Sequence, residues 1–534
     1  MSMQAYRRPF LFFLAFLAGA GVMTLEMAGA RALSPYFGSS NYVWANVIGA
    51  LMASLALGYY IGGRVADRTP RLSLLLILLG SAGVGAGVAS PLLAPVAALC
   101  VPQGIIAEHS FRINLFGSLL ATLIFLVPPV FVLGMVPPFL VRLLARSREE
   151  SGSAAGAVNA FGAVGSIAGT FFPTLVLIPA AGPRPALALA GGALAVAAGA
   201  GAWAFGQGRR RTLVWLFVLP PVLGLLVSGR AVHPGEETLL ETESPYQYVR
   251  VYEKEGKRFL TLNEGRDQYH SLMIEGKVLT EGNYYDYLNL VPLHFDPAHR
   301  ERLRVCVVGL AAGIYSRQIH AFFDPLYRVE IDGAEIDPGV LEAARLHFGL
   351  AGPLNRNLEA APMDGRMLLA TSRGGYDLIA VDAYSRQLYI PFHLVTKEFF
   401  ALCRTRLAPG GMTAVNVCDF SGRSPALEAI RNTMAEVFGA VYVLRLPGTM
   451  NFLVYARKGK APATAGQVLA GLEHPALASH PEAEALKERI RWSIHYRTRH
   501  EPEAGARVLT DDCAPLERLL DASFRDVRRR IEIE

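Results

Sequence analysis

The chain divides into two halves that differ in their pattern of apolar and polar positions. Up to about residue 230, long apolar runs alternate with short polar segments, and an apolar run of roughly twenty residues spans a bilayer as a helix. We therefore expect residues 1–232 to form a polytopic α-helical membrane bundle of about seven helices. The predicted runs lie at about residues 10–32, 42–63, 72–100, 113–140, 153–180, 185–206 and 212–229.

From about residue 233 the period of the pattern changes. The segment "YQYVRVYEKEGKRFLTLNEG" alternates as the two strands of a hairpin, and "EGNYYDYLNLVPLHF" follows with helical spacing. From residue 303, short apolar strands such as "LRVCVVG" and "YDLIAVDAYS" alternate with helical segments, a pattern typical of a parallel, doubly wound sheet. The pattern predicts a small β hairpin subdomain at 233–300 and an α/β Rossmann-like domain at 301–534.

Arginine clusters indicate how the membrane helices are oriented. They lie at 7–8, 64–71, 142–148 and 209–211, in alternate loops, and basic loops of membrane proteins favour the cytoplasm. The pattern predicts a multi-pass protein of the inner cell membrane with a cytoplasmic N-terminus. The C-terminal half is then expected at the cytoplasmic face, although seven spans would place it outside.

Two features of the membrane half concern its interior. Small residues repeat at four-residue spacing in "AAGAVNAFGAVGSIAGT" (154–170), which permits close helix packing. Glu26 and Arg31 lie in or near the first helix, and buried charges in a membrane usually pair with each other or face a polar cavity. A structural ion pair is the favoured interpretation, and a substrate pathway is the alternative.

Charge is distributed unevenly between the halves. Residues 1–232 contain fifteen Arg, no Lys and five acidic residues, a charge of +10, which leaves −4 for the rest of a chain whose total is +6. Because the excess comes from arginines that flank apolar segments, it is not evidence for a nucleic-acid partner. The five cysteines form no CxxC pair and no Cys/His cluster, so we expect no metal site.

The stretch "RVCVVGLAAGIYSRQ" (304–318) is the first candidate for a ligand site. An apolar run ends at Gly309, Gly313 follows, and a helical segment begins, as in a nucleotide-binding turn, although the turn is neither GxGxxG nor a P-loop. Ligands of doubly wound sheets bind at the carboxyl ends of the strands. Three acids stand at successive predicted strand ends, namely Glu335 in "AEID", Asp364 in "PMDGR" and Asp382 in "VDAYS".

Residues 243–460 resemble the spermidine synthase family, the aminopropyltransferases, and the whole chain resembles their membrane-fused members. The resemblance rests on "PYQYVRVYE", "YYDYLNLVPL", the glycine turn, "AEIDPGVLEAAR", "MDGR" and "VDAYS". It implies a small β domain followed by a methyltransferase-like Rossmann domain. It also implies transfer of an aminopropyl group from decarboxylated S-adenosylmethionine to a small-molecule amine, with no metal.

The resemblance implies roles for individual residues on the donor side. Gly309 and Gly313 would form the turn that binds the nucleoside. Glu335 would bind its ribose and Asp364 its adenine.

On the acceptor side, the resemblance makes Asp382 the acid near the reacting amine, with Tyr284 beside the amine. Gln247 would line the cleft as a further residue that binds the donor. A carboxylate with a neighbouring tyrosine can orient an amine and accept its proton. Further candidates for contacting the substrate are Tyr285, Asp286, Ser385 and Asp512.

Two positions depart from the family pattern. The typical turn GGGDG reads "GLAAG" here, so Ala312 stands where an acid would meet the ammonium group of the decarboxylated donor. The family's second active-site acid is replaced by Ser385. Each lost charge-assisted hydrogen bond is worth roughly 1.5–3 kcal/mol. Intact S-adenosylmethionine therefore stays open as the donor, and an apolar or membrane-derived amine as the acceptor.

Aminopropyl transfer is the favoured function, and two alternatives remain. One is a methyltransferase that uses S-adenosylmethionine on the same scaffold. The other is a transporter of amines or polyamines fused to a ligand-binding domain. The lipid bilayer is an expected partner, and the resemblance allows a homodimer.

Overall fold

The computed structural model describes residues 7–37, 41–99, 116–145, 147–205, 217–228, 237–244, 246–263, 269–384, 390–419, 424–459, 461–516 and 518–520. The chain forms two compact units. The first comprises residues 1–235 and 242–248, and the second comprises residues 236–241 and 249–534. The predicted division of the second half into 233–300 and 301–534 stays a prediction.

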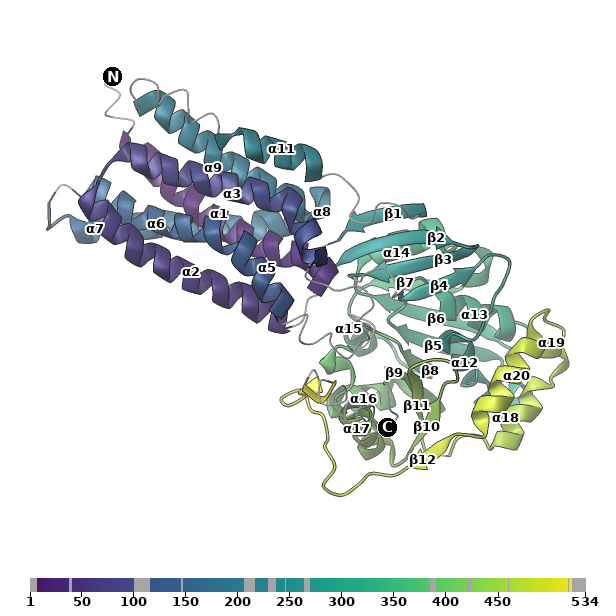
Figure 1. Ribbon diagram of the computed structural model, residues 1–534. Coiled ribbons are helices and arrows are strands. Elements are labelled where there is room, and N and C mark those ends of the chain that lie inside the picture. The colour runs from purple at the N-terminus through teal and green to yellow at the C-terminus, as the bar shows by residue number, and fades with distance from the viewer. Residues whose placement is uncertain are drawn as a thin grey trace, which may run out of the picture. The chain divides into compact units, whose positions relative to one another are not determined.

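The first unit is a bundle of apolar helices (Figure 1). Within the described residues, six helices are long and apolar enough to cross a membrane. The seventh predicted run, 212–229, contains the ten-residue helix α11 in its described part, so the exact number of spans stays a prediction. The helices described in this unit are α1 (Arg7–Phe37), α2 (Asn41–Arg68), α3 (Leu72–Leu99), α5 (Ser118–Phe125), α6 (Val127–Leu144), α7 (Ser151–Phe172), the π-helix η3 (Pro173–Leu177), α8 (Ile178–Ala181), α9 (Pro183–Phe205) and α11 (Leu219–Ser228).

The fourth predicted run begins and ends earlier than the helix that the structure shows. The apolar run 113–140 contains α5, which ends at Phe125, and the helix long enough to span is α6, Val127–Leu144. A proline in the first turn of α6 explains the break, because proline lacks the N–H that would continue α5 but fits the start of a helix.

Helices of the first unit pack in pairs at glycines. α1 packs on α7, α2 on α6 and α3 on α9. A Cβ at Gly165 of α7 would lie 1.9 Å from the backbone oxygen of Phe16, and one at Gly58 of α2 would lie 2.4 Å from that of Phe131. The small residues of 154–170 therefore do allow the close packing that the sequence predicted.

The predicted ion pair between Glu26 and Arg31 is not formed. Glu26 is buried in the bundle, and among the described residues no ion pair joins it to Arg31. The guanidinium of Arg31 instead donates to the backbone carbonyls of Ser244 and Tyr246, in the segment that belongs to the same unit.

The second unit contains an eight-stranded sheet with strand order β12-β10-β11-β9-β8-β5-β6-β7. The pairs β9/β8, β8/β5, β5/β6 and β6/β7 are parallel, as predicted. β10, β11 and β12 pair antiparallel, which the sequence reading did not predict; β10 and β11 are joined by a short loop at 446–450, which permits only an antiparallel pair. The strands are β5 (Arg302–Val308), β6 (Arg328–Glu335), β7 (Leu358–Pro362), β8 (Tyr376–Val381), β9 (Leu407–Cys418), β10 (Val441–Arg445), β11 (Asn451–Arg457) and β12 (Thr498–His500).

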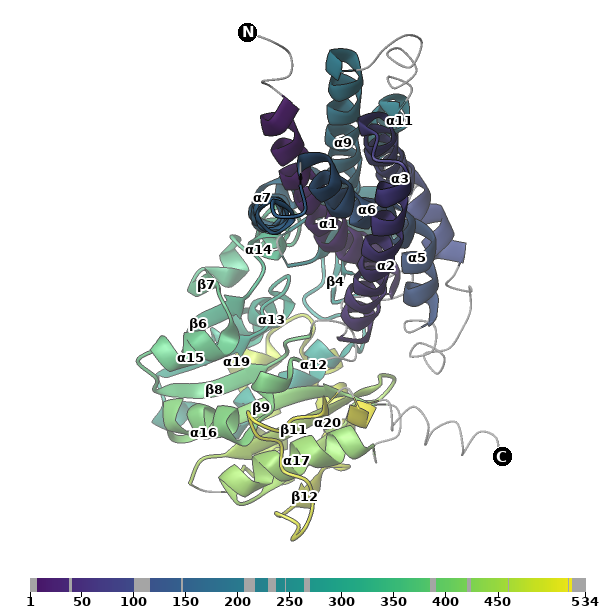
Figure 2. The ribbon, with the colours of Figure 1, turned by 90° about the vertical axis from the view of Figure 1, so that its left-hand side faces the viewer.

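Helices cover both faces of this sheet (Figure 1, Figure 2). Alternate residues of β5 point to opposite faces: Val305 packs into a core with α13, α14, α18 and α20, and Cys306 into a core with α15, α16 and α17. The helices of the second unit are α12 (Tyr284–Leu288), α13 (Ile314–Phe323), α14 (Pro338–His347), α15 (Gly365–Thr371), α16 (Lys397–Arg406), α17 (Pro425–Phe438), α18 (Ala465–Leu472), α19 (Pro475–Ala478) and α20 (Ala483–Ile494).

A smaller sheet precedes the eight-stranded one, with strand order β1-β2-β3-β4. β2 and β3 form the predicted hairpin, because Glu255 and Gly256 both adopt positive φ at the "KEGK" turn. β4 pairs antiparallel with β3. The strands are β1 (Glu237–Glu243), β2 (Tyr248–Lys254), β3 (Lys257–Leu262) and β4 (Ser271–Ile274).

Candidate active site

The glycine turn lies directly beside the end of strand β8. Asp382, the first residue after β8, donates its backbone N–H to the carbonyl of Val308 at 2.8 Å. Gly309 has a φ of +88°, and a Cβ there would lie 2.4 Å from the backbone oxygen of Asp382. Only a residue without a side chain permits this approach. Gly313, with a φ of +74°, then begins α13. The two predicted glycines thus bring the turn against the predicted catalytic acid.

Glu335, on the neighbouring strand β6, accepts a hydrogen bond from the same turn. It is the last residue of β6, and its carboxylate accepts the N–H of Ala311 at 2.9 Å and that of Asp337 at 3.2 Å. The side chain is buried. Burial raises the pKa of Glu335 to about 7, although the backbone N–H groups oppose the shift. Each carboxylate oxygen keeps a lone pair, which is what a ribose hydroxyl would need.

Asp382 and Tyr284 are brought together as the sequence predicted. The hydroxyl of Tyr284, the first residue of α12, donates to Oδ2 of Asp382 at 3.0 Å. Asp382 is partly exposed at the carboxyl end of the central strand β8, but protein atoms surround its carboxyl group closely. Desolvation raises the pKa of Asp382 to about 7, and its hydrogen bonds oppose this shift. Such a group can exist in either protonation state near neutral pH.

A chain of two asparagines holds the other oxygen of Asp382. The amide nitrogen of Asn416, near the end of β9, donates to Oδ1 of Asp382 at 2.8 Å. Asn451, at the start of β11, donates in turn to Oδ1 of Asn416 at 3.0 Å. Asn451 therefore fixes which way the Asn416 amide points, and both oxygens of Asp382 accept a neutral donor.

Aromatic rings surround this acid. The ring of Tyr285 packs on Tyr284 with centroids 4.0 Å apart, and its hydroxyl donates to the backbone carbonyl of His270. The hydroxyl of Tyr384 donates to the backbone carbonyl of Asn416 at 2.7 Å. Burial raises the pKa of each of these three tyrosines, and so does the nearby charge of Asp382. They therefore act here as neutral hydroxyl groups.

Asp364 lies in a different environment at the third predicted strand end. It is the N-cap of α15, and its Oδ1 accepts the N–H groups of Arg366 at 2.9 Å and Met367 at 3.1 Å. Its Oδ2 lies 2.8 Å from Nε2 of His393. The hydrogen bond from His393 is the main reason why the pKa of Asp364 is lowered. This carboxylate stays ionised at neutral pH.

Asp286, a predicted substrate contact, is bonded within the protein. Its buried carboxylate accepts the N–H and the hydroxyl of Thr280, the N–H of Gly282 and the amide of Gln318, all at 2.8–2.9 Å. Arg489 lies 2.8 Å from the same carboxylate. These contacts hold the loop that precedes α12, and so help to place Tyr284. A substrate role for Asp286 stays a prediction.

Three other predicted site residues are not joined to this group by the described contacts. Gln247 is buried and lies in the segment 242–248 that groups with the first unit. Ser385 lies outside the described residues. Asp512 is exposed. Their predicted roles stay predictions.

Ala312 stands where the resemblance to the family places an acid. It is buried, and its backbone N–H donates to the hydroxyl of Ser271 at 3.3 Å. Ala311 beside it has a φ of +46°. The turn thus presents backbone rather than a carboxylate at this point.

The sequence did not predict Asn416 or Arg366 at the site, and His393, in the loop "LYIPFHL", was interpreted as a packed or solvated residue rather than a catalytic one. One signal was present for Asn416, because it is the single amide in "TAVNVC", a strand segment whose other positions suit a buried core. His393 and Arg366 carried no such signal, since their partners come from distant parts of the chain.

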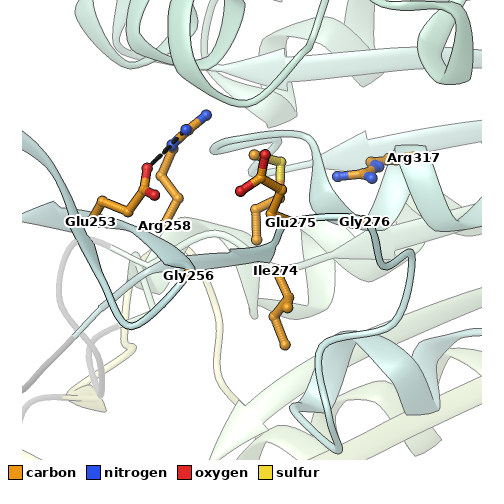
Figure 3. A pocket seen from close by; sticks show the side chains of 8 residues that line it. Glu253, Gly256, Arg258, Ile274, Glu275, Gly276 and Arg317 are labelled. Atoms are coloured by element: carbon orange, nitrogen blue, oxygen red, sulfur yellow. Dashed lines mark hydrogen bonds and ion pairs between the residues drawn. The ribbon is translucent and has the colours of Figure 1, made fainter.

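The site holds no cluster of metal ligands. Among the residues that the structure describes, no group of three or more His, Cys, Asp or Glu side chains is arranged to hold a metal ion. A separate cavity of about 160 Å³ is lined by residues of β2, β3, β4 and α13, and Figure 3 shows Arg317 and Glu275 projecting into it. None of the predicted site residues lines this cavity.

No family model matches the chain. It is 30% identical over 285 residues to the "Probable polyamine aminopropyl transferase" of Bifidobacterium longum, an alignment covering 52% of this chain and 61% of that protein. It is 26% identical over 217 residues to the polyamine aminopropyltransferase of Vibrio vulnificus, covering 40% of this chain and 69% of that protein. The chain thus spans about three fifths to two thirds of the length of these relatives.

Two further comparisons extend the range of relatives. The chain is 29% identical over 167 residues to the human eEF1A lysine and N-terminal methyltransferase, covering 29% of this chain and 23% of that protein. The crystal structure of a probable spermidine synthase from Corynebacterium glutamicum aligns with 52% of this chain and 97% of its own, at 19% identity and a TM-score of 0.39. The curated relatives confirm the predicted resemblance of this chain to the polyamine aminopropyltransferases.

Proposed function

We propose that this protein transfers an aminopropyl group from a sulfonium nucleoside to an amine acceptor. The observation that carries the proposal is the carboxyl group of Asp382, held by Tyr284 and Asn416 beside the glycine turn, with a pKa raised to about 7. A group of this kind can accept a proton from an amine at neutral pH.

The reaction follows from this geometry. The lone pair of the acceptor nitrogen attacks the methylene carbon of the aminopropyl group that is bonded to the sulfonium sulfur. The carbon–sulfur bond breaks, its electron pair stays on sulfur, and methylthioadenosine leaves. One proton passes from the nitrogen to Asp382. Because the sulfonium is already a good leaving group, positioning of the two reactants supplies much of the remaining catalysis.

The donor side is supported by the residues around the glycine turn. Glu335 would accept hydrogen bonds from the ribose hydroxyls, and Asp364 would accept one from the adenine amino group. The relatives named polyamine aminopropyltransferases support decarboxylated S-adenosylmethionine as the donor. Ala312 leaves intact S-adenosylmethionine as the alternative donor, from which the same displacement would transfer a 3-amino-3-carboxypropyl group and also release methylthioadenosine.

The acceptor is an amine, and the rings of Tyr284, Tyr285 and Tyr384 around a single carboxyl group suit one with an apolar or membrane-derived substituent. Within the part of the chain that the structure describes, six helices of spanning length support a multi-pass protein of the inner cell membrane. A cytoplasmic N-terminus and a homodimer are further parts of this proposal.

The test is to identify the nucleoside product. Full-length protein in detergent is incubated with an amine and either donor, and the products are separated by chromatography. The proposal expects methylthioadenosine from the wild-type protein, and a rate lower by about 10²-fold to 10⁴-fold from the Asp382→Asn variant. Methylthioadenosine formed at an unchanged rate by the variant would refute the assignment of Asp382.

A second candidate is methyl transfer, which two observations favour. Ala312 offers no carboxylate that would repel the carboxylate of intact S-adenosylmethionine. One relative is named a methyltransferase. The same chromatogram separates the candidates, because methyl transfer releases S-adenosylhomocysteine.

A further inference from the structure

The motif "VLTDDCAPLERLL" near the C-terminus has no role in the proposed reaction. The sequence raised Asp512 as an acid that could reach the acceptor. In the structure Asp512 is exposed, and its neighbour Asp511 makes the contacts. Both oxygens of Asp511 bind the guanidinium of Arg366, at 2.7 and 2.6 Å. This two-point pairing is the most directional ion-pair geometry that an arginine forms.

Further contacts fix the segment that carries Asp511. The hydroxyl of Thr396, the N-cap of α16, donates to Asp511 at 2.7 Å, and the N–H of Asp511 donates to Glu398 at 3.0 Å. Leu509 is fully buried and accepts the backbone N–H of Lys397 at 2.8 Å. The segment 509–512 is therefore attached to the N-terminus of α16 through both side chains and backbone.

Arg366 connects this segment to the donor side of the site. It is the second residue of α15, whose N-cap is Asp364. Besides binding Asp511, its guanidinium donates to the backbone carbonyl of His393 at 3.2 Å. Nε2 of His393 lies 2.8 Å from Oδ2 of Asp364. A continuous set of contacts runs from Asp511 through Arg366 and His393 to Asp364.

We propose that the C-terminal segment 509–512 positions Asp364 for the nucleobase of the donor, by holding Arg366 and the backbone that carries His393. The inference rests on the proposed function, because it assigns Asp364 to the nucleobase. His393 occupies one oxygen of Asp364 and the helix N–H groups of α15 occupy the other, so the lone pairs left for a ligand have a fixed direction. Arg366, His393 and Asp511 are positioning residues, and none of them acts on the reacting atoms.

The test compares charge-reversal variants of the full-length protein in detergent. Arg366→Glu and Asp511→Lys are each expected to raise the Kd of methylthioadenosine, measured by calorimetry, and the KM of the donor by about tenfold, the equivalent of ~1.4 kcal/mol. The value of kcat at saturating donor and the KM of the amine are expected to stay unchanged. A role limited to general folding would instead lower the amount of active protein and leave Kd and KM unaltered.

Two controls sharpen this test. Arg431→Glu breaks the 2.9 Å ion pair with Glu503, a residue that precedes the segment 509–512. This variant is expected to leave the Kd of methylthioadenosine unchanged. The double variant R366E/D511K restores a pair of opposite charges and is expected to recover part of the lost affinity. His393→Gln, which can still donate to Asp364, is expected to bind more tightly than His393→Ala.

The outcomes separate this inference from the function on which it rests. If wild-type protein binds methylthioadenosine and the Arg366 and Asp511 variants bind it equally well, the inference is wrong and the proposed function stands. A fall in kcat at constant KM would also overturn it. If wild-type protein binds no methylthioadenosine, the proposed function fails and the inference fails with it.

Discussion

The two ends of the candidate site hold carboxyl groups in opposite environments. Asp382 follows β8 and accepts hydrogen bonds from neutral groups, Tyr284 and Asn416, in surroundings that raise its pKa to about 7. Asp364 follows β7 and meets His393 and two backbone N–H groups, which lower its pKa. The neighbouring groups thus give these two aspartates different pKa values, which suit them to different tasks.

This difference in pKa indicates different roles for the two carboxyl groups. A carboxyl group with a pKa near neutrality can take up and release a proton during a reaction, as Asp382 would. A carboxylate that stays ionised and oriented is a fixed hydrogen-bond acceptor, as Asp364 would be for a nucleobase. Changes at the first end should therefore alter the chemical step, and changes at the second should alter donor binding.

The largest expected effect is that of Asp382→Asn. Removing a general base typically slows a reaction by about 10²-fold to 10⁴-fold. We expect kcat for methylthioadenosine formation to fall within that range, while the Kd of methylthioadenosine is unchanged. Initial rates and calorimetry measure the two quantities. A variant that keeps wild-type kcat would remove Asp382 from the chemistry.

Asp364→Asn should produce the opposite pattern. Loss of a hydrogen bond to a charged acceptor costs about 1.5–3 kcal/mol, which corresponds to a rise in donor KM of roughly tenfold to a hundredfold. We expect kcat at saturating donor to stay near the wild-type value. If Asp364→Asn and Asp382→Asn changed the same parameter, the division between the two ends would be wrong.

Tyr284→Phe should have a smaller effect on rate and a visible effect on pH dependence. The Tyr284 hydroxyl donates to Asp382 and lowers its pKa, so its removal should move the inflection of the kcat profile above pH 7. We expect kcat at pH 7 to fall by about tenfold, the value of one charged hydrogen bond. An inflection that moved downward would contradict this assignment.

Asn416→Ala should shift the inflection in the same direction with a smaller loss of rate, because Asn416 touches Asp382 but has no expected contact with the amine. Asn451→Ala, which only frees the Asn416 amide, serves as the graded control. Relative to wild type, we expect a larger upward shift of the inflection for Asn416→Ala and a smaller one for Asn451→Ala. Equal shifts in both variants would show that the amide chain does not act in series.

The smallest expected effects are on stability. The folded state holds the Asp382 proton up to about pH 7, whereas the unfolded chain loses it near its ordinary value of 3.8. Its contribution to stability therefore falls as pH rises through that window. Asp382→Asn should raise the melting temperature at pH 8 relative to wild type and change it little at pH 4.

Asp364 has a lowered pKa, so Asp364→Asn should lower the melting temperature at pH 7.

Much of this fold was readable from local pattern. Apolar runs predicted the helices that are long and apolar enough to cross a membrane, and the alternation of strands and helices predicted the parallel strands β5 to β9. The antiparallel strands β10 to β12 were not foreseen as such, because a strand's direction depends on the connection that precedes it. The break between α5 and α6 was missed because both sides of it are equally apolar.

The sequence predicted the candidate site residues that lie at strand ends. It did not predict the contacts that Arg366 and His393 make with residues far away in the sequence. Glu335, Asp364 and Asp382 lie at or just after the ends of strands, so their positions follow from topology. The pairing of Arg366 with Asp511 joins residues 145 positions apart, and no periodicity encodes such a contact. Similarly, the sequence placed Glu26 near Arg31 but could not show that Arg31 binds backbone carbonyls instead.

The pH dependence of kcat reports on whether Asp382 accepts the proton of the amine. It is measured for methylthioadenosine formation between pH 5 and pH 9, with two amine acceptors of different basicity. A raised pKa of about 7 at Asp382 predicts that kcat is low in acid, rises through an inflection near pH 7 and then levels off. The inflection should be the same for both amines and should disappear in Asp382→Asn. A profile that is flat from pH 6 to pH 8, or an inflection that follows the basicity of the amine, would contradict the account.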